Sequence, residues 1–380
     1  MDFEVSKEHE MIRKEVRRFA QKVIAPQAEE MEANKNIPVN IVEQMGELGF
    51  IGIAFPEEYG GTGGDWVGAH ICLEELARAD LAVSGILDAS SSLVGQELFM
   101  FGSEDQKKKW LAPLLTGQAT TGFALTESNC GSDAGALETT AVLEGNEWVI
   151  NGTKQFISFI AMPNASLCVV AAVTGVDKKG KKIISTFIVP KDNPGMVISK
   201  NYGKMGMKAA PASELIFTDC RIPEENLLGD PERGLAQHLI VLETGRITAA
   251  AMCVGVAQAC LDESLKYAKE RTQFGQPIFN YQAVSFKLAD MAVSIELARN
   301  QYLKAAWLKD KGRPHTFEAS VAKLYASEML EKVTSDAVQI HGGSGYMDEC
   351  PVSRYYRDAR CMQILEGTSE IIRILISRSL

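Results

Sequence analysis

The sequence predicts a mostly helical protein with a β domain in the middle of the chain. Three observations support this fold class. Apolar residues recur at helical spacing in the first third, short β-branched and aromatic runs fill the middle, and long apolar helical stripes fill the rest. We expect an N-terminal helical domain over 1–118, a β domain over 119–225 and a C-terminal helical bundle over 226–380. A chain of 380 residues is long enough for three units that share interfaces.

The first domain is expected to be helical throughout. Over 6–33 the apolar side chains lie at helical spacing, Pro26 is the only strong breaker, and Ser6 with the acidic residues after it suits a helix start. Further helices are expected over 38–48, 66–79, 83–101 and 104–116.

The middle of the chain has the pattern of strands. Runs such as Trp148-Val-Ile alternate with turn-forming stretches, among them Glu144-Gly-Asn and Asn151-Gly. Several short strands without helices between them favour an antiparallel, barrel-like domain and disfavour a doubly wound parallel sheet.

The last domain carries long apolar stripes of helical period. Four stripes of this kind, joined by short connections, suit a four-helix bundle. We expect these helices over 235–269, 280–309, 315–342 and 362–376.

Composition and charge exclude several classes of function. Hydrophobic residues make up 46% and charged residues 23%, as in ordinary globular proteins, and the net charge of -10 argues against nucleic acid and anionic membranes as partners. The start of the chain lacks a secretory signal, and no apolar run suggests membrane insertion. The eight cysteines contain no CxxC pair and the five histidines no ligand-spaced cluster, so we expect reduced thiols, no metal and a cytoplasmic location.

Two glycine-rich stretches resemble dinucleotide-binding loops but lack the right context. They are Gly60-Gly-Thr-Gly-Gly and Gly342-Gly-Ser-Gly. Neither follows an expected strand and opens a helix, so the nicotinamide fingerprint is not met. Both are expected to be loops.

Six longer segments have a composition suited to binding a planar, phosphate-bearing ligand. In the first, backbone N–H groups, Thr126 and Ser132 could hold the carbonyls of a ring and a phosphate. In the second, Phe156 and Ser158 share one face of a strand, where an aromatic ring and a hydroxyl could stack on a ring and bond to its edge. The segments begin at Phe123, Asn151, Leu242, Tyr267, Gln339 and Ile364.

Together these segments resemble the acyl-CoA dehydrogenase family, in the same order and over essentially the whole chain. The resemblance implies FAD as the cofactor, a homotetramer, and an electron-transferring flavoprotein as the electron acceptor. It also implies that Glu366, within Leu365-Glu-Gly-Thr, is the base that removes the α-proton of an acyl-CoA thioester while the β-hydrogen leaves as hydride.

The resemblance assigns further residues position by position. Cofactor-binding roles fall on Phe123, Leu125, Thr126, Phe156, Ser158, Arg271, Phe274, Gln282, Gln339, Gly342, Gly343, Thr368 and Glu370. Substrate-binding roles fall on Ser132, Glu243 and Arg246. The chain departs from the family pattern at Phe156, often Trp, at Ser158, usually Thr, and at Glu243, more often Asp.

Simpler interpretations compete with these assignments. Taken alone, Arg271, Arg246 and Glu370 could be solvated helix charges, Phe156 and Phe274 could be core residues, and Glu366 could be a helix-start carboxylate. A flavin monooxygenase or oxidase on the same fold would share the cofactor motifs, and so would a non-catalytic scaffold. The presence of Glu366 favours α-proton removal over both.

The acyl group is interpreted from Asp88. In this family the position is usually small and uncharged, and an Arg one turn earlier grips a distal carboxylate in glutaryl-CoA dehydrogenases; here that position is Ser84. Asp88 could cap a helix or pair with a cation, or it could be a second catalytic carboxylate facing the acyl group. With Leu365 in place of the usual Tyr, this pattern favours cyclohexanecarboxyl-CoA or a cyclohexenecarboxyl-CoA. The alternative is a short-chain, butyryl-type substrate.

Overall fold

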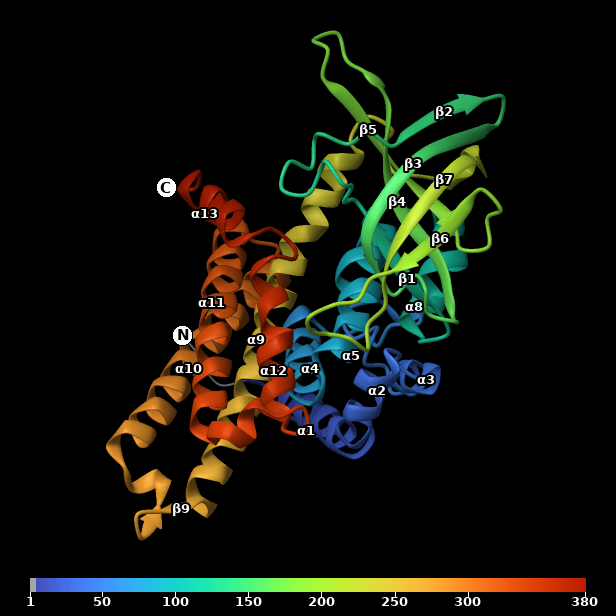
Figure 1. The fold of residues 1–380 in the computed structure, drawn as a ribbon. Helices are drawn as coiled ribbons and strands as arrows, with labels where there is room; N and C mark the ends of the chain where they lie inside the picture. The colour runs from blue at the N-terminus through green and yellow to red at the C-terminus, as the bar shows by residue number, and fades with distance from the viewer. Residues whose placement is uncertain (1–4) are drawn as a thin grey trace.

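The computed structural model describes residues 5–380 and has the expected order of a helical, a β and a second helical part (Figure 1). Side-chain caps mark the starts of α1 and α4. Ser6 Oγ accepts the N–H of His9 at 3.1 Å, and Asp65 Oδ1 accepts the N–H of Gly68 at 2.8 Å. In the first part, where η marks 3₁₀ and π segments, the elements are α1 Lys7–Phe19, η1 Ala20–Ile24, η2 Ala25–Gln27, α2 Ala28–Asn34, α3 Val39–Glu47, η3 Glu57–Tyr59, α4 Trp66–Ala79, α5 Leu81–Leu87, η4 Asp88–Leu93, α6 Val94–Phe101, α7 Glu104–Gln106, η5 Lys107–Leu111 and α8 Ala112–Leu115.

The β part is an open mixed sheet, so the expectation of an antiparallel barrel was wrong. The strand order is β6-β7-β3-β2-β4-β5-β8, with β1 off this path and parallel to β4. The two end strands of the sheet, β6 and β8, do not pair with each other within residues 5–380. Strand β6 pairs with β7, and the two-residue strand β8 pairs with β5. The strands are β1 Thr120–Ala124, β2 Thr140–Glu144, β3 Glu147–Ser158, β4 Ala165–Val176, β5 Lys182–Pro190, β6 Met196–Asn201, β7 Ala212–Pro223 and β8 Leu227–Leu228.

Asn151-Gly, expected to be a turn, lies within the continuous strand β3. Its pairing with β7 is irregular between Ile150 and Gly152, and the side chain of Asn151 accepts the N–H of Asp219 at 2.8 Å. The asparagine therefore supports a bulge, and the turn between β2 and β3 falls at Gly145, with φ +64°.

The C-terminal part consists of three long helices and two short ones within the described residues. The fourth expected helix, 362–376, begins later, and the unexpected α12 precedes it. The elements are η6 Glu224–Asn226, α9 Gly234–Glu270, β9 Thr272–Gln273, β10 Gln276–Pro277, η7 Ile278–Asn280, α10 Gln282–Asp310, α11 Thr316–His341, η8 Gly342–Tyr346, α12 Pro351–Ala359, η9 Arg360–Gln363 and α13 Ser369–Ser377.

Helix α9 is the central element of the helical core. It is long and apolar enough to cross a membrane, but 78% of its most apolar window is buried inside the protein, as in the core helix of a globular fold. It packs closely on α4 at Gly255, where an added Cβ would lie 2.1 Å from the carbonyl oxygen of Glu74. One hydrophobic core joins the N-terminal helices to the C-terminal bundle, and a separate cluster fills the sheet.

Candidate active site

Glu366 lies in a tight turn between η9 and α13. Its φ of +53° and the φ of +100° at Gly367 are both left-handed, so the turn is held in a conformation that a non-glycine residue seldom adopts. The helix starts only at Thr368, whose hydroxyl accepts the N–H of Ile371 at 3.3 Å. Glu366 is therefore not a helix-start carboxylate, since it precedes the cap.

The carboxylate of Glu366 points at helix α9. A Cβ added to Gly245 would lie 2.6 Å from Glu366 Oε2 and 3.0 Å from Leu93 Cδ2, so a larger residue here would displace the carboxylate. Glu366 Oε2 is buried and has no hydrogen-bond partner within residues 5–380. A buried acceptor without a partner is costly, which is the expected state of a base that awaits a ligand.

Asp88 brings a second carboxyl group to Glu366. It begins the π segment η4, and its Oδ1 is also buried and unpartnered within the described chain. Burial, followed by the charge and hydrogen bonding of Glu366, raises the pKa of Asp88 well above its ordinary value. Asp88 is thus neither a helix cap nor the partner of a cation, and burial beside Glu366 favours its neutral form.

Asp88 and two further residues, Lys323 and Arg246, affect the pKa of the Glu366 carboxyl. Burial raises the pKa of this carboxyl, while a hydrogen bond from Asp88 and the charges of Lys323 and Arg246 act in the opposite direction. Arg246 lies on α9 next to Gly245 and is 6% exposed, with its Nε unpartnered among residues 5–380. Glu243, one turn earlier on α9, accepts the hydroxyl of Thr316 at 2.8 Å.

The ends of β1 and β3 form a second group of expected site residues. The N–H of Gln155 donates to the carbonyl of Thr126 at 2.9 Å, which holds the end of β1 beside Phe156. Phe156 is 59% exposed, has a φ of +62°, and packs on Tyr202 with ring centroids 5.0 Å apart. Ser158, Phe123, Leu125 and Thr126 are half-buried, and Ser132 is exposed in the loop that follows.

These residues have side chains of the kinds that a flavin ring would contact. Phe123, Leu125 and Phe156 are apolar, Thr126 and Ser158 carry hydroxyls, and the position of Gly131 is open, with nothing within 4 Å of an added Cβ. Past the end of β3, the ring of Phe159 lies 3.0 Å from a Cβ added to Gly85 of α5. The β part of the site therefore adjoins the helix that leads to Asp88.

Six other expected cofactor residues lie at the opposite end of α9. Arg271, Phe274 and Gln282 surround the β9–β10 hairpin, which Figure 1 shows far from the sheet, and Phe274 is 95% exposed. Gln339, Gly342 and Gly343 lie at the end of α11 near this hairpin, because His341 stacks on Tyr267 with centroids 4.5 Å apart. Within a single chain, these six residues do not lie next to Thr126 and Phe156. Thr368 and Glu370 lie beside Glu366, at the start of α13.

Two residues of the site were missed by the sequence analysis. Gly245 could have been noticed, because a glycine inside a long helix costs roughly 1 kcal/mol and usually has a packing reason. Lys323, on α11, has no sequence signal of its own, since a lysine in an amphipathic helix is ordinarily solvated.

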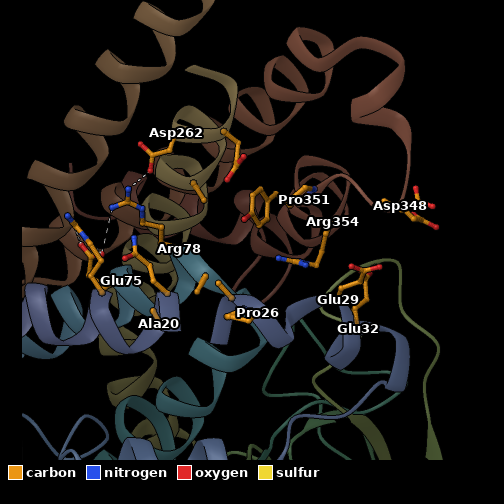
Figure 2. A pocket seen from close by; sticks show the side chains of 18 residues that line it. Ala20, Pro26, Glu29, Glu32, Glu75, Arg78, Asp262, Asp348, Pro351 and Arg354 are labelled. Carbon is orange, nitrogen blue, oxygen red and sulfur yellow. Dashed lines mark hydrogen bonds and ion pairs between the residues drawn. The ribbon is translucent and has the colours of Figure 1, made fainter. Parts of the chain in front are cut away.

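A separate cavity of about 390 Å³ lies between α1, α4, α9 and α12. Figure 2 shows Arg78 bound to Asp262 and Glu75, and Glu75 also pairs with Arg17. None of the residues around Glu366 lines this cavity. These ion pairs join α1, α4 and α9, and they are separate from the buried carboxylate of Glu366.

Three family models cover this chain. They describe the N-terminal, middle and C-terminal domains of acyl-CoA dehydrogenases and match residues 6–118, 122–220 and 232–380. The fold and the buried carboxylate define a flavoprotein oxidoreductase of the CH–CH class, and the chain belongs to the acyl-CoA dehydrogenase family. It is an acyl-CoA dehydrogenase. The domain boundaries expected from the sequence stay predictions.

Similar proteins cover the chain from end to end. A Bacillus subtilis protein named probable acyl-CoA dehydrogenase is 51% identical over all of both chains, and the mouse mitochondrial short-chain specific acyl-CoA dehydrogenase is 44% identical over 98% of this chain and 90% of its own. Butyryl-CoA dehydrogenase from Megasphaera elsdenii has a TM-score of 0.96 at 38% identity, covering 100% and 99% of the two chains. A chain solved in work on the electron transferring flavoprotein of Acidaminococcus fermentans gives 0.96 at 42%, with the same coverage.

Proposed function

We propose that this protein converts a short straight-chain acyl-CoA of the butyryl type into the 2,3-enoyl-CoA, with Glu366 as the base. The position of the Glu366 carboxylate supports this most strongly: it is buried, unpartnered and held against Gly245 by a left-handed turn. Burial strengthens it as a base, because the charged form loses its hydration.

The reaction removes two hydrogens from neighbouring carbons. Glu366 takes the α-hydrogen as a proton, and the β-hydrogen leaves with its electron pair as the double bond forms. FAD, when bound by the residues of β1 and β3, supplies the acceptor for that hydride. The carboxyl of Asp88 lies beside that of Glu366, and burial together with the charge of Glu366 raises the pKa of Asp88, since two charges so close would repel.

The substrate proposal follows the relatives. Two of the similar proteins are named for short-chain or butyryl substrates, whereas the alicyclic substrate expected from Asp88 and Leu365 receives no support from them. Asp88 does face Glu366, but its role as a second catalytic carboxylate stays a prediction.

The test is anaerobic bleaching of the flavin by two thioesters. We expect butyryl-CoA to reduce the purified enzyme faster than cyclohexanecarboxyl-CoA, as followed by the loss of flavin absorbance in a stopped-flow instrument. The variant Asp88→Asn keeps a donor for Glu366 and serves as the matched comparison. Faster reduction by cyclohexanecarboxyl-CoA, lost in Asp88→Asn, would instead support the alicyclic substrate. A flavin that no acyl-CoA bleaches would contradict the dehydrogenase mechanism.

The cofactor, the electron acceptor and the assembly belong to the same proposal. The hydroxyl of Thr126 and the ring of Phe156 at the ends of β1 and β3 support FAD, and the similarity to a chain studied with an electron transferring flavoprotein supports such a protein as the acceptor. A homotetramer is supported by the cluster at Arg271, which lies roughly 40 Å from Gly245 along α9, at about 1.5 Å per residue. We propose that this cluster completes the cofactor site of a neighbouring copy.

Arg271→Ala is expected to weaken both FAD retention and assembly, because it removes a cation from a diphosphate and from an interface. Gel filtration with the ratio of flavin to protein absorbance measures both. Lys266→Ala, an exposed cation on the last turns of the same helix, is the matched control and should behave as wild type. If Arg271→Ala elutes as a fully flavinated oligomer of unchanged size, Arg271 is only a surface charge.

A further inference from the structure

Lys323 is a fully buried lysine beside the catalytic turn. It lies in the middle of α11, is 0% exposed, and its Nζ donates to the carbonyl oxygen of Gly367 at 2.6 Å. Burying an ammonium group costs several kcal/mol unless it is compensated. A single carbonyl bond is a weak compensation for a full charge, so the position calls for a nearby anion.

Burial lowers the pKa of Lys323, and the nearby charge of Glu366 acts to raise it. The groups that face Glu366 come from three elements: Asp88 from η4, Arg246 and Cys253 from α9, and Lys323 from α11. Cys361 of η9 adds a thiol near Lys323. Burial raises the pKa of both thiols, to about 12 for Cys361, so neither carries charge at neutral pH.

The bond from Lys323 also constrains the geometry of the turn. Gly367 has a φ of +100° and Glu366 a φ of +53°, conformations that need support from their surroundings. The carbonyl that Lys323 binds belongs to the residue directly after Glu366. Fixing this carbonyl fixes the peptide from which the carboxylate projects toward Gly245.

We propose that Lys323 is a positioning residue for the base: its ammonium group clamps the Glu366–Gly367 turn and favours the charged form of the carboxylate. The inference rests on the proposed role of Glu366. Burial raises the pKa of Glu366, and the positive charge of Lys323 opposes that rise, as does Arg246.

The first test is the pH dependence of flavin reduction by butyryl-CoA. In Lys323→Met the pKa of Glu366 should rise, because a charge that favours the carboxylate is gone. The acidic limb of the rate profile should therefore move about 1 pH unit upward, the lower end of the usual effect of a nearby opposite charge. Lys323→Arg keeps the charge and should keep the limb near that of wild type. Lys332→Met, an exposed lysine on the same helix, should leave the profile unchanged.

A role confined to packing would lower the rate of Lys323→Met equally at every pH, and that result would overturn the proposal. A second readout uses no activity. Thermal unfolding of the apoprotein should show that Lys323→Met is less destabilising in a Glu366→Gln background, since the neutral amide no longer needs the cation. Should Lys323→Met fail to fold, the added Glu366→Gln is expected to restore folding, and equal failure in both backgrounds would refute the electrostatic link.

The failure of this inference is distinguishable from failure of the proposed function. Near-normal flavin reduction in the single variant Glu366→Gln would refute Glu366 as the base and with it the proposed function. If the acidic limb of the rate profile does not move in Lys323→Met while Glu366→Gln is inactive, only the proposed role of Lys323 is refuted.

Discussion

Glu366→Gln is expected to slow flavin reduction by butyryl-CoA by about 10²–10⁴-fold, because general bases contribute on this order and glutamine cannot accept the α-proton. Glutamine has nearly the same shape, so the contact with Gly245 should survive. Binding of acyl-CoA should survive too, since the amide keeps the size and shape of the carboxyl group. Anaerobic stopped-flow absorbance measures reduction, and the spectral change on substrate addition measures binding.

Glu296→Gln provides the control for the Glu366 experiment. Its carboxylate is largely exposed on α10 and, among residues 5–380, pairs with Arg299 and Asn300 of the same helix, so reduction should proceed as in wild type. Near-normal reduction in Glu366→Gln would show that another group removes the proton. Asp88 would then be the first candidate, because its carboxyl lies beside Glu366.

Lys154→Met should produce the largest loss of stability among the changes considered. Lys154 is 0% exposed, and its Nζ lies 2.7 Å from Glu127 Oε1 and 3.1 Å from the carbonyl of Leu125. Glu127 in turn accepts the N–H groups of Glu138 and Thr139 at 2.7 and 3.1 Å. Removing the cation leaves a buried carboxylate without its counter-charge, which typically costs about 3–5 kcal/mol.

The same change should release the cofactor. Although burial acts to raise it, the Lys154 ammonium holds the pKa of Glu127 below its ordinary value, so Glu127 is charged in the folded protein. The pair ties together the two ends of the loop that carries Thr126 and Ser132. Thermal unfolding followed by flavin fluorescence reports on both effects, because free flavin is released when the loop opens.

An exposed ion pair of the same sheet gives the matched control. Arg221 lies 2.7 Å from Glu144 on the surface of the β part, and Arg221→Met should change unfolding little, since surface pairs are weak and screened. Adding Glu127→Gln to Lys154→Met should recover part of the lost stability, because the buried charge is then gone. Equal unfolding temperatures for Lys154→Met and Arg221→Met would show that the buried pair contributes no more than the exposed one.

The sequence predicted the order of the three parts, because helix and strand patterns are local, whereas the roles of the site residues came from the family resemblance and stay predictions. Helical spacing located α4, α9, α10 and α11 to within a few residues. The segment around Glu366 pointed to a base, and the structure gives this residue a buried carboxylate facing Gly245. Both results follow from information that lies within short stretches of chain.

Other features depend on partners distant in sequence and could not be foreseen in this way. The sheet is open and mixed because β1 aligns with β4, a pairing that strand patterns alone do not reveal. Asn151-Gly has the composition of a turn, but Asp219 holds it in a strand. Lys154 and Lys323 are charged residues whose burial is decided by carbonyls and carboxylates from other elements. The side-by-side position of Asp88 and Glu366 likewise appears only in the folded chain.

Helix α9 also restricts how the gene for this protein can change. Gly245 must face Glu366, and Arg271 ends the same unbroken helix. One inserted or deleted residue between them would turn the far end by about 100° and shift it by about 1.5 Å, since a helix advances in fixed steps. Substitutions would leave that spacing intact. Over evolution the length of this stretch should therefore be preserved more strictly than its amino acids, and a frame-preserving indel inside α9 should be eliminated even where each residue is individually replaceable.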